Sequence, residues 1–239
     1  MQDTVYGVLV PLFLFSSPIF AYYTNSFIID VSALSFALIA WYFFFSFYRK
    51  KKNISLLISI LFFTLAGLTK ITALISFIPL LFLALLELLN IRKTIPEKKL
   101  FNKPLRQIPF LLLPIFFVAS WTMYAIHYNN IHLGGVFSTE ILPFWKLDSE
   151  TKRLTLEKLY NDLLPQYFNF SALMMVLVLF FVVIISYKKV NAFLLYQTSA
   201  VFVGSLLYIV LWFKVFNVHD YYLINLLIFV PFVLLTFLN

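Results

Sequence analysis

Three short stretches of this sequence place polar side chains at the ends of long apolar runs. Asp30 follows the polar-aromatic segment 22–29, Lys70 lies between two apolar runs, and residues 219–222 (His-Asp-Tyr-Tyr) precede the last run. A carboxylate, an ammonium group and a His-Asp pair could together hold a phosphate, take up a proton or bind a divalent metal ion. These residues are the candidates for chemistry, and the elements around them must bring them together.

Asp30 and Lys70 each have a structural interpretation beside the functional one. Asp30 begins a predicted helix, where a carboxylate can cap free backbone N–H groups and interact favourably with the helix dipole. A carboxylate at a membrane boundary is equally a functional candidate. Lys70 could extend from a helix end to lipid head groups. Because its sequence neighbours are almost all apolar, a phosphate or a nearby acid is its expected partner.

The segment of residues 219–222 also allows two interpretations. Tyr221 and Tyr222 fit an aromatic belt at the membrane surface. The adjoining His219 and Asp220 are harder to assign to such a belt, because a His-Asp pair can bind a divalent cation or relay a proton. The residues by themselves leave both interpretations of this segment open.

The composition indicates an integral membrane protein. Hydrophobic residues make up 62% of the 239 residues, charged residues 12%, and the mean hydropathy is +0.94, which leaves too little polar surface to cover a soluble globule. The apolar runs lack the alternation of barrel strands, so the spanning elements should be helices. The net charge of +8 sits in short hinges, which argues against nucleic acid as a partner. The absence of cysteine excludes disulfides and thiolate metal sites.

The apolar runs predict an all-α fold, a polytopic transmembrane bundle of about eight helices in a single domain over residues 1–239. The run of residues 54–89 is too long for one helix, and Gly67 with Thr69 and Lys70 marks the turn that divides it. The predicted spans are residues 5–23, 31–48, 54–69, 71–89, 108–126, 171–187, 192–213 and 221–238, with one long loop at residues 127–170.

The distribution of basic residues predicts the orientation. Hinges 49–53, 90–107 and 188–190 fall on one side of an eight-span bundle and hold four, six and two Lys or Arg residues, twelve of the 18 in the chain. The positive-inside rule assigns this side to the cytoplasm. Asp30, Lys70 and all three histidines then face out. We expect Asp30, Lys70 and His219 to approach one cavity at that face of the membrane.

The long loop contains a predicted amphipathic helix over residues 149–164. Its apolar positions have helical spacing, and Pro165 is expected to end it. The apolar face is formed by Leu156, Leu159, Tyr160, Leu163 and Leu164. Such a helix could lie in the membrane interface and cover a cavity between the spans, or it could be part of a plain solvent-exposed connection.

The polar stretches resemble a known family when they are taken in order. The pattern Tyr-Tyr-Thr-Asn-Ser-Phe-Ile-Ile-Asp at residues 22–30, then Ala-Gly-Leu-Thr-Lys-Ile-Thr at 66–72 and Val-His-Asp-Tyr-Tyr-Leu-Ile-Asn at 218–225, is similar to bacterial polyprenyl-phosphate-dependent glycosyltransferases of the GT-C fold. These are relatives of the protein O-mannosyltransferases and of the lipid A aminoarabinose transferase. The resemblance extends from residue 11 to residue 231.

The resemblance implies an activity and a set of site residues. It implies inverting transfer of a sugar from a polyprenyl-phosphate donor to a glycan, lipid or protein acceptor outside the cytoplasm. Asp30 and Lys70 match catalytic positions, and Lys70 also matches a substrate-binding position. His219, Asp220, Tyr221 and Tyr222 match substrate-binding positions, and a divalent metal ion could be held by Asp30, His219 and Asp220.

One departure from the family pattern concerns the catalytic base. In the family, the acid usually assigned as base lies in a first external loop that precedes the region of resemblance. Span parity places Asp3 on the cytoplasmic side, so Asp3 cannot replace that acid. We therefore expect a shortened family member or one half of a split protein. The alternative is a non-enzymatic transporter or a scaffold of an envelope-glycan assembly complex.

Overall fold

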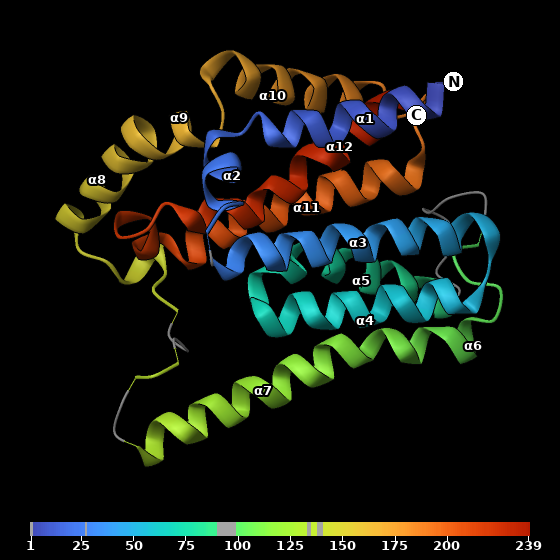
Figure 1. Ribbon diagram of the computed structural model, residues 1–239, viewed down its shortest axis with the longest axis horizontal. Coiled ribbons are helices and arrows are strands. Elements are labelled where there is room, and N and C mark those ends of the chain that lie inside the picture. The colour runs from blue at the N-terminus through green and yellow to red at the C-terminus, as the bar shows by residue number, and fades with distance from the viewer. Residues whose placement is uncertain (1, 27, 90–98, 133–134, 138–140) are drawn as a thin grey trace.

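The computed structural model describes residues 2–26, 28–89, 99–132, 135–137 and 141–239, and the described residues form helices and no strands. Figure 1 shows long helices packed side by side, with both chain ends at the right of the view and a helical loop segment capping the left. Part of one predicted hinge, residues 90–98, and part of the predicted external loop, residues 133–134 and 138–140, lie outside the described residues.

The helical membrane architecture is confirmed in its coarse form. Five helices within the described residues are long and apolar enough to cross a membrane, and a bent pair raises this number to six. The helix at Asn53–Thr69 is apolar but has only 17 residues. The division into eight spans, and the GT-C arrangement of those spans, stay predictions.

The described elements are all helices. They are α1 (Gln2–Phe15), α2 (Pro18–Tyr23), α3 (Ile29–Lys50), α4 (Asn53–Thr69), η1 (Ile71–Ser76), α5 (Phe77–Leu88), α6 (Pro104–Gln107), η2 (Ile108–Leu111), α7 (Leu112–Ile131), η3 (Phe144–Lys146), α8 (Ser149–Lys158), η4 (Leu159–Leu163), α9 (Leu164–Tyr167), α10 (Phe170–Ile185), α11 (Ala192–Leu211), η5 (Phe213–Asn217), η6 (Tyr221–Ile228) and α12 (Phe229–Leu238).

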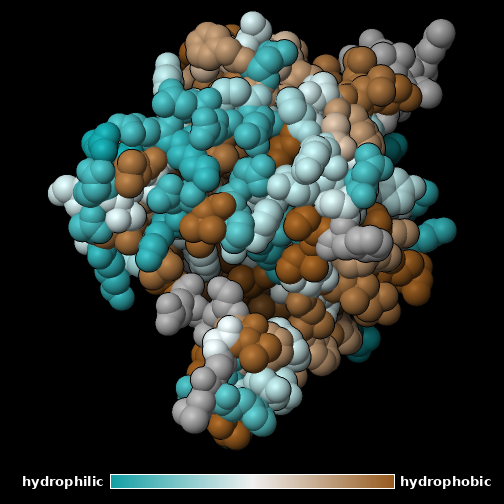
Figure 2. Space-filling view, turned by 60° about the vertical axis from the view of Figure 1, so that its left-hand side comes forward, coloured by the Kyte–Doolittle hydropathy of each residue, from teal (hydrophilic) through white to brown (hydrophobic). Residues whose placement is uncertain are grey.

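The junctions between consecutive helices lie at the two ends of the bundle. The α2–α3 and α11–η6 junctions lie toward the left in Figure 1, near α8 and α9, and the α4–η1 junction lies at the left end of α4, below α3. We call this the site end, because Asp30, Lys70 and residues 219–222 belong to these junctions. Figure 2 turns it toward the viewer and shows hydrophilic side chains gathered there, while hydrophobic side chains are frequent on the flank.

An aromatic core holds the junctions in place. Trp41 of α3 is buried and donates a hydrogen bond from Nε1 to Ser76 Oγ at 2.8 Å, which fixes η1 against α3. Gly67 of α4 allows close packing, because a Cβ there would lie 2.7 Å from Val118 Cγ2 of α7 and 2.9 Å from Leu74 Cδ1 of η1. These contacts set the position of Lys70, three residues after Gly67.

The first predicted span, residues 5–23, is not one continuous helix. α1 ends at Phe15 and α2 begins at Pro18, which is favoured in a first helical turn and has no N–H to donate to the preceding helix. Ser17 at the break is buried, and its hydroxyl donates to the Tyr167 carbonyl at the end of α9 at 2.7 Å. The break therefore ties the first helices to the loop segment.

The predicted loop helix is present, but its end and its packing face differ from the prediction. The helix continues through Pro165 to Tyr167, because a π-helical segment, η4, precedes the proline and Pro165 lies in the first turn of α9. Leu163 is buried as expected, whereas Leu156 and Tyr160 are 52% and 74% exposed. The buried residue of α8 is Thr155.

The loop helix lies across the end of the bundle. The segment Ser149–Tyr167 and helix α10 are bent by 86° relative to each other. Lys158 Nζ donates to the carbonyl of Asn217 in η5 at 2.7 Å, and this bond fastens the loop helix over the chain that leads to η6. The loop segment is therefore a packed cover of the site end rather than a loose connection.

Candidate functional site

Asp30 and Lys70 form a buried ion pair at the site end. Lys70 Nζ lies 2.5 Å from Asp30 Oδ1; the Asp30 side chain is fully buried and the Lys70 side chain is 13% exposed. Asp30 occupies the first turn of α3, and Lys70 is an extended residue between α4 and η1. The structure thus brings together two site residues that the sequence separates by two apolar runs.

Asn225 is a third member of this cluster. Its Nδ2 donates to Asp30 Oδ1 at 2.7 Å, so one carboxylate oxygen receives both donors. Within the described part of the chain, the other oxygen, Asp30 Oδ2, and the amide oxygen of Asn225 are buried without a hydrogen-bond partner. Buried acceptors without donors are costly. The cluster therefore presents two acceptor oxygens to whatever donor group enters it.

The 3₁₀ geometry of η6 explains how one segment reaches both charges. Side chains three residues apart eclipse each other in a 3₁₀ helix. Tyr222 and Asn225 have this spacing, and the Tyr222 ring lies 3.9 Å from Lys70 Nζ while Asn225 contacts Asp30. The Tyr221 ring lies 5.2 Å from the same ammonium. Lys70 is thus held by a carboxylate and by aromatic faces that attract a cation.

Asp220 and His219 belong to the same region but have other partners. Asp220 Oδ1 accepts a hydrogen bond from the hydroxyl of Tyr23 at 2.6 Å. The exposed His219 ring stacks on Tyr221 at 4.8 Å between centroids. Tyr221 therefore contacts both Lys70 and His219, and the Tyr23 ring contacts it edge-on at 6.1 Å.

The capping interpretation of Asp30 is not what the structure shows. Ile28 occupies the N-cap position of α3 and makes no side-chain cap, and the carboxylate of Asp30 is engaged by the side chains of Lys70 and Asn225. An acid in the first helical turn still interacts favourably with the helix dipole. Its partners, however, come from two other elements, so Asp30 joins three segments of the chain.

The predicted metal ligands do not form a ligand set in the part of the chain that the structure describes. No group of three or more His, Asp or Glu side chains there could hold a metal ion. Asp30 faces an ammonium group, and Asp220 faces a phenol hydroxyl. The divalent metal ion stays an expectation of the resemblance, and no step below depends on it.

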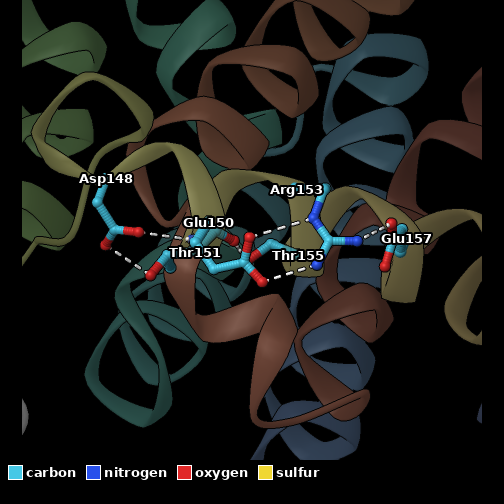
Figure 3. Close-up of polar contacts among 6 residues, drawn as sticks. All are labelled: Asp148, Glu150, Thr151, Arg153, Thr155 and Glu157. Atoms are coloured by element: carbon cyan, nitrogen blue, oxygen red, sulfur yellow. Dashed lines mark hydrogen bonds and ion pairs between the residues drawn. The ribbon is translucent and has the colours of Figure 1, made fainter.

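The start of the loop helix carries a second polar cluster, drawn in Figure 3. Asp148 caps α8, accepting from the Thr151 backbone N–H at 2.8 Å and from its hydroxyl at 2.7 Å. These bonds hold the pKa of Asp148 below its usual range. Arg153 bonds to Glu150 and to Glu157, and its guanidinium lowers the pKa of Glu150. This cluster is exposed and stabilises the loop helix locally.

Two residues of the site could not be assigned from the sequence alone. Asn225 closes the third motif but has no titratable group, and Tyr23 resembles an ordinary interfacial tyrosine. The available signal was spacing, since Asn225 follows Tyr222 by three residues and helical neighbours at that distance share a face.

Comparisons of the chain with models of protein families, with curated proteins and with solved structures gave no match.

Proposed function

We propose that this chain is a membrane glycosyltransferase that transfers a sugar from a polyprenyl-phosphate-linked donor to an acceptor at the extracytoplasmic face. One observation carries the proposal. Residues of all three motifs that resemble the GT-C enzymes meet in one buried cluster, in which Asp30 contacts both Lys70 and Asn225, and Tyr222 covers Lys70. A shared reaction centre would require this convergence.

The cluster offers the two groups that such a transfer needs. When the acceptor oxygen bonds to the anomeric carbon, the bond from that carbon to the phosphate oxygen breaks and its electron pair leaves with the polyprenyl phosphate. Lys70 supplies a positive charge for the departing phosphate. The proton of the acceptor hydroxyl goes to a carboxylate, and Asp30 Oδ2 is an acceptor without a partner.

The rival interpretation as a transporter would need polar groups within the spans, and Gln197 belongs to the polar run Gln197, Thr198 and Ser199 inside one predicted span. Gln197 of α11 is fully buried, and neither polar atom of its amide has a hydrogen-bond partner among the described residues. Its neighbour Thr198 bonds to Thr236 within the helix pair. A transporter is expected to place ionisable groups or broken helices near the membrane midplane. Gln197 is not ionisable, whereas the buried ion pair lies at the site end, which favours chemistry at the surface.

The direct test measures sugar transfer in membranes that contain the full chain. Radiolabelled polyprenyl-phosphate sugars serve as donors, and three variants are compared with the wild type. Asp30→Asn/Lys70→Met removes both charges together and should fold, since no unpaired charge remains, yet transfer no sugar. Lys70→Arg keeps the charge and should retain part of the activity, and the exposed control Arg153→Met should retain all of it. Normal transfer by the double variant would overturn the proposal.

Orientation is tested separately with single cysteines, because the natural chain has none. Lys146 in the loop and Lys189 between α10 and α11 are both exposed. An impermeant thiol reagent added to intact cells should label Lys146→Cys and leave Lys189→Cys unlabelled. The reverse pattern would place the site end in the cytoplasm and remove the extracytoplasmic reaction.

A further inference from the structure

A pocket of about 560 Å³ lies between the loop helix and the chain entering η6. This volume falls within the roughly 300–1,000 Å³ typical of small-molecule sites. Five of its seven lining residues are polar or charged. The lining consists of Lys158, Asn161, Asp162, Leu163, Gln166, Val218 and Asp220.

The polar groups of this pocket are largely unused by the protein. Among the described residues, the side chains of Asn161, Asp162 and Gln166 form no hydrogen bond or ion pair; Asn161 and Asp162 are exposed to solvent, and Gln166 is half-buried. Asp220 uses Oδ1 to accept from Tyr23, which leaves its other oxygen free for a ligand. Lys158 is engaged with the carbonyl of Asn217. The free groups are thus two carboxylates and two amides.

The local helix geometry gives a second reason to regard this pocket as a site. Asn161, Asp162 and Leu163 all lie in η4, a π-helical segment inside an otherwise α-helical run. π-segments are uncommon and frequently occur at functional sites, because the extra residue changes which side chains face inward. Here three consecutive residues of the π-segment line one pocket.

The chemistry of the free groups selects the ligand class. The two carboxylates outnumber the single ammonium of Lys158, so the lining carries a net negative charge that disfavours the donor's phosphate at this position. Two carboxylates without a third ligand do not make a metal site in the described part of the chain. Carboxylate and amide groups pair well with vicinal hydroxyls, to which carboxylates act as acceptors and amides as both donors and acceptors.

We propose that this pocket binds a hydroxyl-rich carbohydrate, namely the sugar of the acceptor. The assignment rests on the proposed function, and it identifies the acceptor of the transfer as a carbohydrate. It also fits the position of the pocket. Asp220 is bonded to Tyr23, the Tyr23 ring contacts Tyr221, and Tyr221 lies 5.2 Å from the ammonium of Lys70. A sugar in the pocket would therefore contact Asp220, which is linked through Tyr23 and Tyr221 to the ammonium of Lys70.

Binding can be measured without the unknown donor. Saturation-transfer difference NMR on the full chain in detergent, with glucose, galactose, mannose and N-acetylglucosamine as probes, should detect binding of at least one sugar. Asp162→Asn and Gln166→Leu should each weaken that binding about tenfold, the loss expected for one good hydrogen bond to a charged or amide group. Glu157→Gln is the matched control, since Glu157 lies on the same loop helix but does not line the pocket.

The outcomes separate this inference from the proposed function. If no probe binds, or if the control weakens binding as much as Asp162→Asn does, the pocket is not a carbohydrate site. If inorganic phosphate competes with the sugar, the assignment of the pocket to the acceptor is wrong. Sugar binding without any transfer by the wild-type chain would contradict the enzyme while supporting the pocket. Transfer that is unchanged in both pocket variants would support the enzyme and contradict the pocket.

Discussion

Ion pairs occur in two contrasting environments among the described residues. On the loop helix, Arg153 lies 2.7 Å from both Glu150 and Glu157, and all three side chains are more than half exposed. At the site end, Lys70 and Asp30 are almost completely buried, and one carboxylate oxygen is left without a donor. The pairs of Arg153 follow from helical spacing within α8, whereas the pair of Lys70 and Asp30 joins two separate elements.

The difference indicates which pair has a role beyond folding. Exposed ion pairs contribute little to stability. A buried pair is often no more stabilising than well-packed apolar residues of the same size, because desolvation offsets the attraction. A buried ion pair in which one carboxylate oxygen has no donor is thus not expected to increase the free energy of unfolding much over apolar residues. This favours a functional interpretation of Asp30 and Lys70, and the contrast can be tested by removing one charge at a time.

The largest effect is expected when the buried pair is broken. Lys70→Met leaves the Asp30 carboxylate buried without its cation and should lower the free energy of unfolding by about 3–5 kcal/mol. Most of this loss should be regained in Asp30→Asn/Lys70→Met. The measurement is reversible unfolding in detergent micelles. Arg153→Met, the exposed counterpart, should leave the unfolding transition unchanged. An equal cost for Arg153→Met and Lys70→Met would remove the distinction between the two environments.

A smaller effect is expected at Asn225. Asn225→Leu removes the amide hydrogen bond to Asp30 and should lower the free energy of unfolding by about 1–2 kcal/mol. In the Asp30→Asn/Lys70→Met background the same substitution should cost less than about 0.5 kcal/mol, because the charged acceptor is gone. Equal costs in the two backgrounds would show that Asn225 acts through packing rather than through the charge of Asp30.

The smallest effect concerns the exposed cluster and depends on pH. The folded pKa of Asp148 lies below its unfolded value, so the cap stabilises α8 at pH values above the unfolded pKa of about 3.9. The contribution is lost as the pH falls through the folded pKa. Amide exchange in α8, corrected for intrinsic rates, should show constant protection from pH 8 to 5 and a loss only in stronger acid. Asp148→Asn caps without titrating and should reduce this acid-dependent loss to the part that comes from Glu150, whose pKa is also lowered.

Much of the helical architecture could be predicted because long apolar runs leave few alternatives to membrane helices. The proximity of Asp30 and Lys70 could also be expected from the sequence, since counting spans and basic hinges predicts that both residues lie on the same side of the membrane. The break at Ser16 and Ser17 was less visible, because the residues around it are as apolar as those of a continuous span.

The rest of the site depends on backbone geometry that composition does not encode. Residues 221–228 have the apolar pattern of an α-helix, yet they form the 3₁₀ helix η6, which places Tyr222 and Asn225 over the two charges. The π-segment η4 similarly carries the loop helix past Pro165 and turns Asn161 and Asp162 toward the pocket. Both features arise from tertiary packing, which overrides the local pattern.

The length of α10 has a consequence for the surrounding lipid. Its 16 residues extend about 24 Å, roughly 6 Å less than the hydrocarbon thickness of a typical bilayer. Where α10 crosses the membrane, the bilayer must thin beside it, or the perpendicular loop helix must sink below the level of the head groups. Thinning would draw the lipid head groups beside α10 toward the bend that joins α10 to the loop helix. Under the proposed function, this is the direction from which the phosphate of a lipid-linked donor would approach the site end, by lateral diffusion within the membrane.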